Sequence, residues 1–255
     1  MSTAIDARRP GLSSWLTLIR CEAKMVIRDT AGLVIPIGLP MLILVMSAST
    51  AGDEVVANGR TVLDVYVLPL VFTVVMATVG IVNMPSFLAY YRRSGILRRL
   101  SVTPASPAMV LVAQAVVSVL QAVIGIGAAL AVAVLVFDAN LPVRPVTALG
   151  LVLLAMAALY AVGMVVAAVA PTPNSAVAIG LIVFFAFGAL GGLFGGRGGL
   201  PDPLARVGEL LPFGATVEVL SAAWAGAAID PVHLMGLTAT IVLGGVVSAV
   251  FFRWG

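Results

Sequence analysis

Long apolar runs constrain this chain more than any other feature of its sequence. A helix needs about 20 consecutive, mostly apolar residues to cross the hydrocarbon core of a bilayer. The chain is 61% hydrophobic and only 10% charged, whereas a typical soluble domain has about 25% charged residues. We therefore expect an all-α polytopic membrane protein with six transmembrane helices. The predicted spans cover about residues 31–50, 62–89, 108–137, 146–170, 176–193 and 233–252.

The segments outside these spans carry structural signals of their own. From Leu12 to Arg28, apolar residues recur at helical spacing beside basic ones, which predicts an amphipathic helix lying in the membrane interface. A helix packed on a soluble domain is the alternative. Residues 195–231 mix glycine and proline with short apolar pieces, which predicts short re-entrant outer helices. We divide the chain into a cytoplasmic leader with an interfacial helix, 1–30, and one six-span transmembrane domain, 31–255.

The basic residues are distributed unevenly between the two sides of the predicted membrane. With six spans both termini share one side. That side carries ten of the 14 Lys and Arg residues, four of them in the loop 90–107, and the other side carries the remaining four. Short cytoplasmic loops accumulate Lys and Arg. We therefore expect a multi-pass protein of the cell (plasma) membrane with both termini and the arginine-rich loop in the cytoplasm, where the loop can contact membrane lipid.

The sequence has no motif for catalysis or metal binding. It lacks a G-x-x-x-x-G-K-[ST] phosphate loop, and its one lysine, Lys24, does not follow a glycine. A single cysteine, Cys21, and a single histidine, His233, do not make a Cys/His metal site of the usual spacing. We predict that the chain has no catalytic residue, metal or cofactor of its own, and nothing in it indicates a nucleic-acid partner.

Ionisable residues within the spans bear on transport driven by protons. Asp64 lies near the outer end of the second span and Glu218 lies in the outer segment, and we expect both to be wetted rather than buried. A proton-coupled secondary transporter therefore remains an alternative function, kept open by Asp64. A membrane scaffold or sensor that transports nothing is a further alternative.

Uncharged polar residues mark one face of the third span. Gln114, Ser118 and Gln121 stand at positions i, i+4 and i+7 of a helix, and Asn83 is a similar residue in the second span. Such side chains face other helices or a water-lined path rather than lipid. Hydrogen bonds between helices and a substrate path are both compatible with this pattern.

Glycine recurs at every fourth position near the end of the fifth span. Gly188, Gly192 and Gly196 would leave one ridge of a helix almost without side chains, so that another backbone can approach closely. We predict a helix interface there, with a neighbour within the chain or in a second copy.

Two segments and the chain end resemble a known family. The loop "YRRSGILRRLSVTPASP", 91–107, resembles the cytoplasmic loop of the type-2 ABC exporter permeases, the membrane subunits of daunorubicin-type drug exporters. The stretch "LPFGATVEVLSAAWAG", 211–226, is similar to the family's pattern before the last span, and "FFRWG", 251–255, resembles its usual ending. Family members often carry a glutamate just before the first arginine, where this chain has Tyr90 and Tyr91.

The resemblance implies a permease subunit of an ATP-driven exporter. A separate ATP-binding cassette subunit would bind ATP and magnesium, and a second permease chain, identical or homologous, would complete the path. The cargo would be a hydrophobic or amphipathic compound such as a drug, antibiotic or lipid, as in multidrug efflux and antibiotic resistance; a polysaccharide or another polymer is the alternative. The loop 90–107 would form a coupling helix on the ATPase, although four arginines would also bind anionic lipid without any partner. The coupling residues implied are Arg92, Arg93, Gly95, Ile96, Leu97, Arg98, Arg99 and Leu100.

Overall fold

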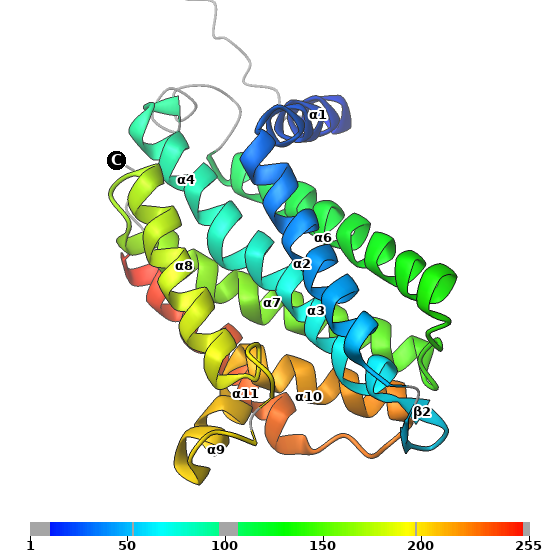
Figure 1. The fold of residues 1–255 in the computed structure, drawn as a ribbon. Helices are drawn as coiled ribbons and strands as arrows, with labels where there is room; N and C mark the ends of the chain where they lie inside the picture. The colour runs from blue at the N-terminus through cyan, green and yellow to red at the C-terminus, as the bar shows by residue number, and fades with distance from the viewer. Residues whose placement is uncertain (1–10, 53, 97–106, 197, 252–255) are drawn as a thin grey trace, which may run out of the picture.

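The structure is a bundle of long helices, shown in Figure 1. The computed structural model describes residues 11–52, 54–96, 107–196 and 198–251. Within these ranges six helices are long and apolar enough to cross a membrane, which confirms the predicted all-α polytopic class. They are α2 (Thr30–Thr50), the continuous helix Leu63–Arg93, α6 (Pro107–Phe137), α7 (Pro145–Val169), α8 (Pro173–Leu190) and α11 (Pro231–Phe251).

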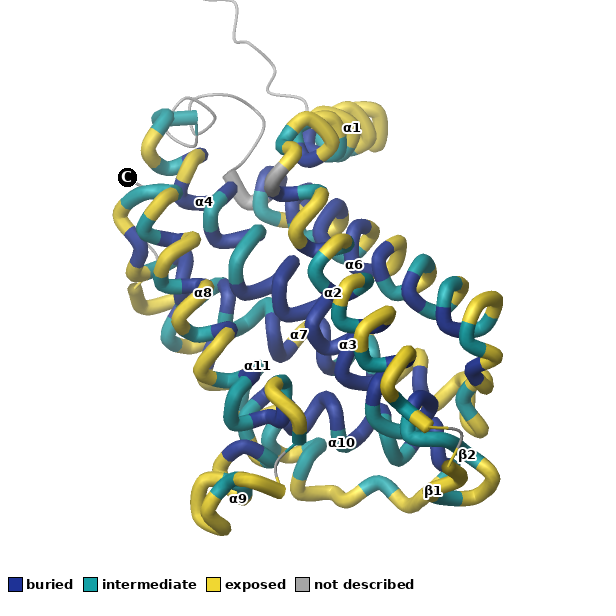
Figure 2. The backbone as a smooth tube through the Cα atoms, in the orientation of Figure 1, coloured by how far each residue is buried: buried dark blue, intermediate teal, exposed yellow. Residues whose placement is uncertain are grey.

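The helix Leu63–Arg93 lies at the centre of the bundle, and we call it the central helix. In its most apolar stretch 89% of the residues are buried, against 28% for α2 and α6 and 17% for α11. Figure 2 shows the same contrast, with a mostly buried tube at the middle and exposed residues on the surrounding helices. The outer helices therefore turn apolar faces outwards, as expected of helices that meet lipid, while the central helix meets almost only protein.

The central helix contains two π-helical segments. It consists of η1 (Leu63–Val67), α3 (Leu68–Ala77), η2 (Thr78–Asn83) and α4 (Met84–Arg93), and η1 and η2 are π-helical. Pro69 and Pro85 stand at the start of α3 and α4. A proline cannot donate to the carbonyl four residues before it, and its ring clashes with that carbonyl. Those carbonyls belong to Val65 and Ile81, so both π segments coincide with the places where proline disrupts α-helical bonding.

Glycines let α7 approach the central helix closely. A Cβ atom added to Gly163 of α7 would overlap the carbonyl oxygen of Gly80 in η2, and one added to Gly80 would overlap the ring of Tyr160. Small residues at such crossings allow the two backbones to touch. α7 also packs along α11, where a Cβ on Gly244 would lie 2.9 Å from the Cβ of Ala161.

The helix α1 (Leu12–Arg28) covers the segment for which an amphipathic helix is predicted. It lies across one end of the bundle, the end at which α4 finishes with Arg92 and Arg93 (Figure 1). We call this the arginine end. The location of α1 in a membrane interface stays a prediction.

The opposite end carries a short hairpin and two further helices. Strands β1 (Val55–Ala57) and β2 (Arg60–Thr61) pair antiparallel. Between α8 and α11, the segment predicted to hold re-entrant outer helices contains α9 (Asp202–Leu210), which is largely exposed, and α10 (Pro212–Ala225), which is mostly buried. α10 packs against η1, α3 and α7. Its Trp224 meets Phe72 of α3 edge to face, with ring centroids 5.4 Å apart, so α10 is an integral part of the bundle.

The contact between α7 and η2 gives a direct test of this packing. We expect Gly163→Ala to lower the stability of the purified protein by about 1–3 kcal/mol, because the added methyl group pushes two backbones apart. The matched control is Gly150→Ala on the same helix, where the added Cβ has open space. Thermal unfolding in detergent measures both variants, and equal melting temperatures would contradict the assigned packing.

Candidate functional site

A side-chain hydrogen bond joins α1 to the end of α4. The hydroxyl of Tyr91 donates to Oε2 of Glu22 at 2.5 Å and lies 3.6 Å from the sulfur of Met25. Glu22 is only 4% exposed, although it belongs to a helix whose opposite face is open. We call Glu22, Met25 and Tyr91 the α1–α4 clasp. It fixes the orientation of α1 relative to the last turn of the central helix.

The clasp lies in apolar surroundings. Val26 of α1, Phe87 of α4 and Val117 of α6 form a buried cluster with Tyr91. Burial in this cluster raises the pKa of the Glu22 carboxyl, and the hydrogen bond from Tyr91 opposes that shift less strongly. The carboxyl therefore holds its proton to a higher pH than a glutamate in water.

Arg92 joins the end of α4 to the end of α7. Its Nη2 donates to the carbonyl oxygen of Ala170, the residue that follows the last turn of α7. A cation at this position also interacts favourably with the negative end of the α7 dipole. Arg92 is half-buried, whereas its neighbour Arg93 is exposed. One of the predicted coupling arginines thus has a contact within the chain.

The turn after α4 contains two more predicted coupling residues. Gly95 has a positive φ of 68°, and its N–H donates to the carbonyl of Arg92 at 3.3 Å. Ile96 is half-buried and packs against the apolar cluster beside the clasp. Ile96 therefore packs against the rest of the chain. The remaining predicted coupling residues, Leu97, Arg98, Arg99 and Leu100, lie outside the described residues.

Two amides of the predicted polar stripe meet at the start of α2. Nδ2 of Asn83 and Nε2 of Gln121 both donate to the carbonyl oxygen of Gly32, at 2.6 and 2.7 Å. Asn83 also reaches Oε1 of Gln121 at 3.4 Å. These bonds tie α2, the central helix and α6 together. At Asn83 and Gln121 the geometry favours hydrogen bonding between helices over an open path.

The rest of the stripe is also buried. Gln114 is 1% and Ser118 is 2% exposed, and Oε1 of Gln114 has no hydrogen-bond partner among the described residues. Gln121 borders a small cavity of about 90 Å³ between α1, α2 and α6. The stripe faces the interior rather than lipid, and its role as a substrate path stays a prediction.

The predicted glycine ridge does not continue as a helix. α8 ends at Leu190, so that only Gly188 lies within it, while Gly192 and Gly196 follow in turns with φ of 96° and 88°. A Cβ on Gly188 would meet the side chain of Leu193 at 2.8 Å, and the carbonyl of Gly192 accepts a 2.5 Å hydrogen bond from the Tyr66 hydroxyl. The prediction that Gly188, Gly192 and Gly196 lie on one ridge of a single helix is therefore wrong beyond Leu190. Glycine adopts the positive φ values that end the helix there.

Asp64 is buried, which corrects the expectation that it is wetted. Its side chain is 0% exposed and accepts hydrogen bonds from the backbone N–H groups of Thr61, at 3.0 Å, and Asn140, at 2.7 Å. Nδ2 of Asn140 adds a third bond at 3.0 Å. Three N–H donors suit a carboxylate that stays in place and ties the central helix to the α6–α7 loop. Glu218, the other expected wet carboxylate, is half-buried.

The sequence does contain a signal for this arrangement. Thr61 and Asp64 fit the pattern [ST]-x-x-[DE] that precedes an apolar helix and forms a capping box. The reciprocal bond is present, since the N–H of Asp64 donates to Oγ1 of Thr61 at 3.4 Å. In the part of the chain that the structure describes, no group of three or more His, Cys, Asp or Glu residues could hold a metal ion.

Comparison with known proteins supplies a family for this architecture. Residues 13–224 match the family described as "ABC-2 type transporter". The match includes nearly all of α1 and α10 and every described element between them. No curated protein matches the chain.

The raised pKa of Glu22 predicts how stability depends on pH. The folded state holds the Glu22 proton above 4.5, the ordinary value of this group, and so binds more protons than the unfolded state. Stability should therefore fall as pH rises from about 4.5 through the raised pKa. Glu22→Gln should flatten that part of the profile, whereas Glu54→Gln, at an exposed position, should not. Thermal unfolding across pH measures the three profiles, and an unchanged slope in Glu22→Gln would contradict the assignment.

The shared carbonyl of Gly32 predicts coupled effects of Asn83→Ala and Gln121→Ala. Each should lower stability by roughly 0.6–2 kcal/mol, the range for hydrogen bonds between membrane helices. The double variant should lose more than the sum, because each single variant leaves one amide bonded to the carbonyl of Gly32, whereas the double variant leaves that carbonyl without either donor. Thr238→Ala is the control, since its hydroxyl donates to the carbonyl of Leu234 in its own helix. Unchanged stability together with lost transport would instead favour the substrate path.

Proposed function

Because the chain belongs to the ABC-2 type transporter family, we propose that it works as the permease subunit of an exporter for a hydrophobic or amphipathic compound. The family match covers residues 13–224 and is the observation that carries this proposal. Membership makes the chain an ABC-type permease subunit, whose partner is an ATP-binding cassette subunit. The proposal has three further parts. Transport is outward, the cargo is a daunorubicin-type drug or an antibiotic, and the chain takes part in multidrug efflux.

The arginine end is the proposed coupling site for the ATP-binding subunit. The loop 90–107 continues directly from α4, so a displacement of the loop acts on the last turn of the central helix. That turn is tied to α1 through Tyr91 and Glu22 and to the end of α7 through Arg92. A force applied at the loop would therefore be passed to three helices through side-chain bonds rather than absorbed by a free hinge.

The energy source is proposed to be ATP held with magnesium by the partner subunit. A proton-coupled carrier needs an ionisable group that can gain and lose a proton along the path. Asp64 is buried in the central helix, but three N–H donors occupy its carboxylate and fix it to a loop. This geometry supports a structural role for Asp64 and so favours nucleotide-driven over proton-driven transport.

A second permease chain, identical or homologous, is proposed to complete the path. α8 buries few of its residues, with 22% buried in its most apolar stretch. At its end Phe185 and Phe194 are exposed and stacked, with ring centroids 6.4 Å apart. Exposed aromatic pairs are common at the centre of protein interfaces. The proposed orientation places both termini and the arginine end in the cytoplasm, as the distribution of Lys and Arg indicates.

The coupling proposal is tested by placing charge on the apolar positions of the loop. We expect Leu97→Asp combined with Leu100→Asp to leave the protein inserted but to abolish both export and co-purification of the candidate ATP-binding subunit. Carboxylates there would have to be buried without a partner in a groove of the ATPase. The measurements are nucleotide-dependent export in reconstituted vesicles and recovery of the subunit on the tagged permease.

The matched control places the same charges at the opposite end of the bundle. Val55→Asp combined with Val56→Asp changes two exposed apolar residues of β1 and should preserve both export and co-purification. Unimpaired export by the loop variant would defeat the coupling assignment. Export driven by an ion gradient without any ATP-binding subunit would defeat the proposed function as a whole.

A further inference from the structure

The helix α1 has one face on the bundle and another that is open. Glu22 and Val26 are buried against α4 and α6, whereas the large apolar side chains of Leu12, Leu16 and Ile27 are 84%, 54% and 65% exposed. Figure 2 shows α1 as a largely exposed tube whose buried residues lie on the side of the bundle. We call Leu12, Leu16 and Ile27 the apolar stripe, and it borders whatever surrounds this end of the molecule.

Three cations lie beside the apolar stripe. Arg20, Lys24 and Arg28 are exposed and stand four residues apart, so they occupy successive turns of α1. We call them the basic stripe. At about 100° per residue, the apolar stripe covers about 60° of the helix circumference and the basic stripe covers about 80° next to it. The open face of α1 is therefore apolar on one side and cationic on the other.

α1 has no exposed carboxylate that could neutralise the basic stripe. Glu22 is the single acidic residue of this helix, and it is buried with its carboxyl group bonded to Tyr91. Asp29, which follows α1, uses its carboxylate to cap α2, where it accepts a hydrogen bond from the N–H of Gly32 at 3.1 Å. The open face of α1 thus complements a partner that carries negative charge.

The junction with α2 determines the depth of α1 in the membrane. Only Asp29 separates α1 from α2. The 21 residues of α2 extend over about 32 Å, which is close to the thickness of the hydrocarbon core, about 30 Å. Because α1 lies across the end of the bundle (Figure 1), it lies where the hydrocarbon begins. At that depth acyl chains can cover the apolar stripe while headgroups reach the basic stripe.

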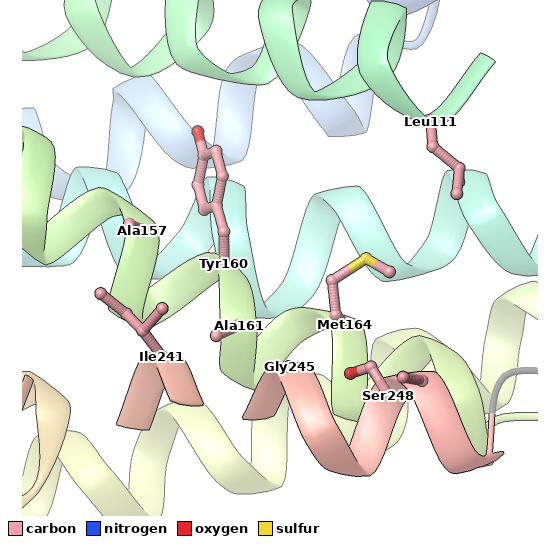
Figure 3. A pocket seen from close by; sticks show the side chains of 9 residues that line it. Leu111, Ala157, Tyr160, Ala161, Met164, Ile241, Gly245 and Ser248 are labelled. Atoms are coloured by element: carbon pink, nitrogen blue, oxygen red, sulfur yellow. The ribbon is translucent and has the colours of Figure 1, made fainter. Parts of the chain in front are cut away.

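A groove on the side of the bundle shows what a surface without charge offers. The groove has a volume of about 630 Å³ and lies between α6, α7 and α11, and none of its described lining residues is charged. Figure 3 shows the apolar side chains of Leu111, Met164 and Ile241 around it. Such a surface accommodates the acyl chains of any lipid. The basic stripe, in contrast, distinguishes lipids by the charge of their headgroups.

We infer that the open face of α1 is a binding surface for anionic phospholipid, and that it selects such lipid over zwitterionic lipid in the leaflet at the arginine end. Arg20 and Arg28 bind headgroup phosphates, which suit the planar donor set of a guanidinium group, and Lys24 adds a third positive charge. The apolar stripe inserts among the acyl chains. Binding requires neither nucleotide nor another subunit.

The α1–α4 clasp connects this surface to the central helix. Tyr91, in the last turn of α4, bonds to Glu22 on the buried side of α1. Anionic lipid on the opposite side therefore binds a helix that is fixed to the bundle. A ligand that binds the folded protein and not the unfolded chain stabilises the folded protein by mass action.

The test measures which lipid collects around α1. Cys21 is the only cysteine of the chain and is exposed on α1, so a bimane fluorophore attached to it reports from beside the basic stripe. The purified full-length protein in phosphatidylcholine nanodiscs receives a trace of spin-labelled phosphatidylglycerol, or of phosphatidylcholine with the same spin label on its acyl chain. We expect the anionic probe to quench the fluorophore equally at about one fifth of the mole fraction or less, the factor that corresponds to one cation near an anionic surface.

Salt provides a control on the unaltered protein. High salt screens exposed charges, so it should remove most of the difference between the two probes. Equal quenching by the two probes at low salt would overturn the inference, and so would a difference that salt does not change.

Substitutions in the basic stripe test its role directly. The combined variant Arg20→Gln, Lys24→Gln and Arg28→Gln should reduce the difference between the probes by about threefold or more. Arg20→Lys combined with Arg28→Lys keeps the charge and should keep most of the difference. An unchanged difference in the Gln variant would refute the assignment to these residues.

The matched control removes three charges at the opposite end of the bundle and should leave the difference between the probes unchanged. It combines Arg60→Gln on β2, Arg144→Gln before α7 and Arg206→Gln on α9. Equal losses in this control and in the Gln variant of the basic stripe would show an effect of net charge alone and would overturn the inference.

Thermal unfolding in nanodiscs supplies a second measurement. Phosphatidylglycerol should raise the melting temperature of the unaltered protein but not that of the Gln variant of the basic stripe, and the two should melt alike in phosphatidylcholine alone, which shows that the variant folds. Equal quenching by both probes, together with loss of the ATP-binding subunit from the Gln variant, would assign the basic stripe to that subunit and overturn the lipid site.

Discussion

The absence of hydrogen-bonding solvent around the central helix is the constraint on which the rest of the structure depends. Polar groups buried in a membrane protein must be satisfied by the protein itself. Thr73 and Thr78 donate back to carbonyls of their own helix, at 2.7 and 2.8 Å. Asn83 and Asp64 instead bond to other segments, and these bonds define where α2 and the α6–α7 loop attach. The polar residues of the central helix thus position the elements around it.

The same constraint explains how the arginine end is organised. Tyr90 and Tyr91 precede the first arginine of the loop, Arg92. A carboxyl group reaches Tyr91 from α1, since Glu22 accepts the hydrogen bond of the Tyr91 hydroxyl. The loop is therefore anchored by a side-chain pair 69 residues apart in the sequence. The position of α1 therefore follows that of the central helix.

Bonded and unbonded polar groups distinguish two regions of the bundle. At Gly32 two amides share one acceptor, and that junction is packed. The buried hydroxyls of Tyr160 and Ser248, on α7 and α11, have no hydrogen-bond partner among the described residues. The first arrangement is expected of a structural joint. The ring of Tyr160 packs against Gly80 of η2.

The sequence alone determined the class of the protein and the number of its long apolar helices, because the thickness of the hydrocarbon core sets the length of a run. It also contained signals for local features, such as Pro69 and Pro85 beside the π segments and the capping box of Thr61 and Asp64. Only the tertiary structure decided which span is central, that Asp64 is buried, and that Glu22 meets Tyr91. The tertiary structure also showed that α8 ends at Leu190, so that the predicted glycine ridge does not continue to Gly196. Spacing along one chain reports the face of a helix, but burial and pairing depend on which other helix lies against that face.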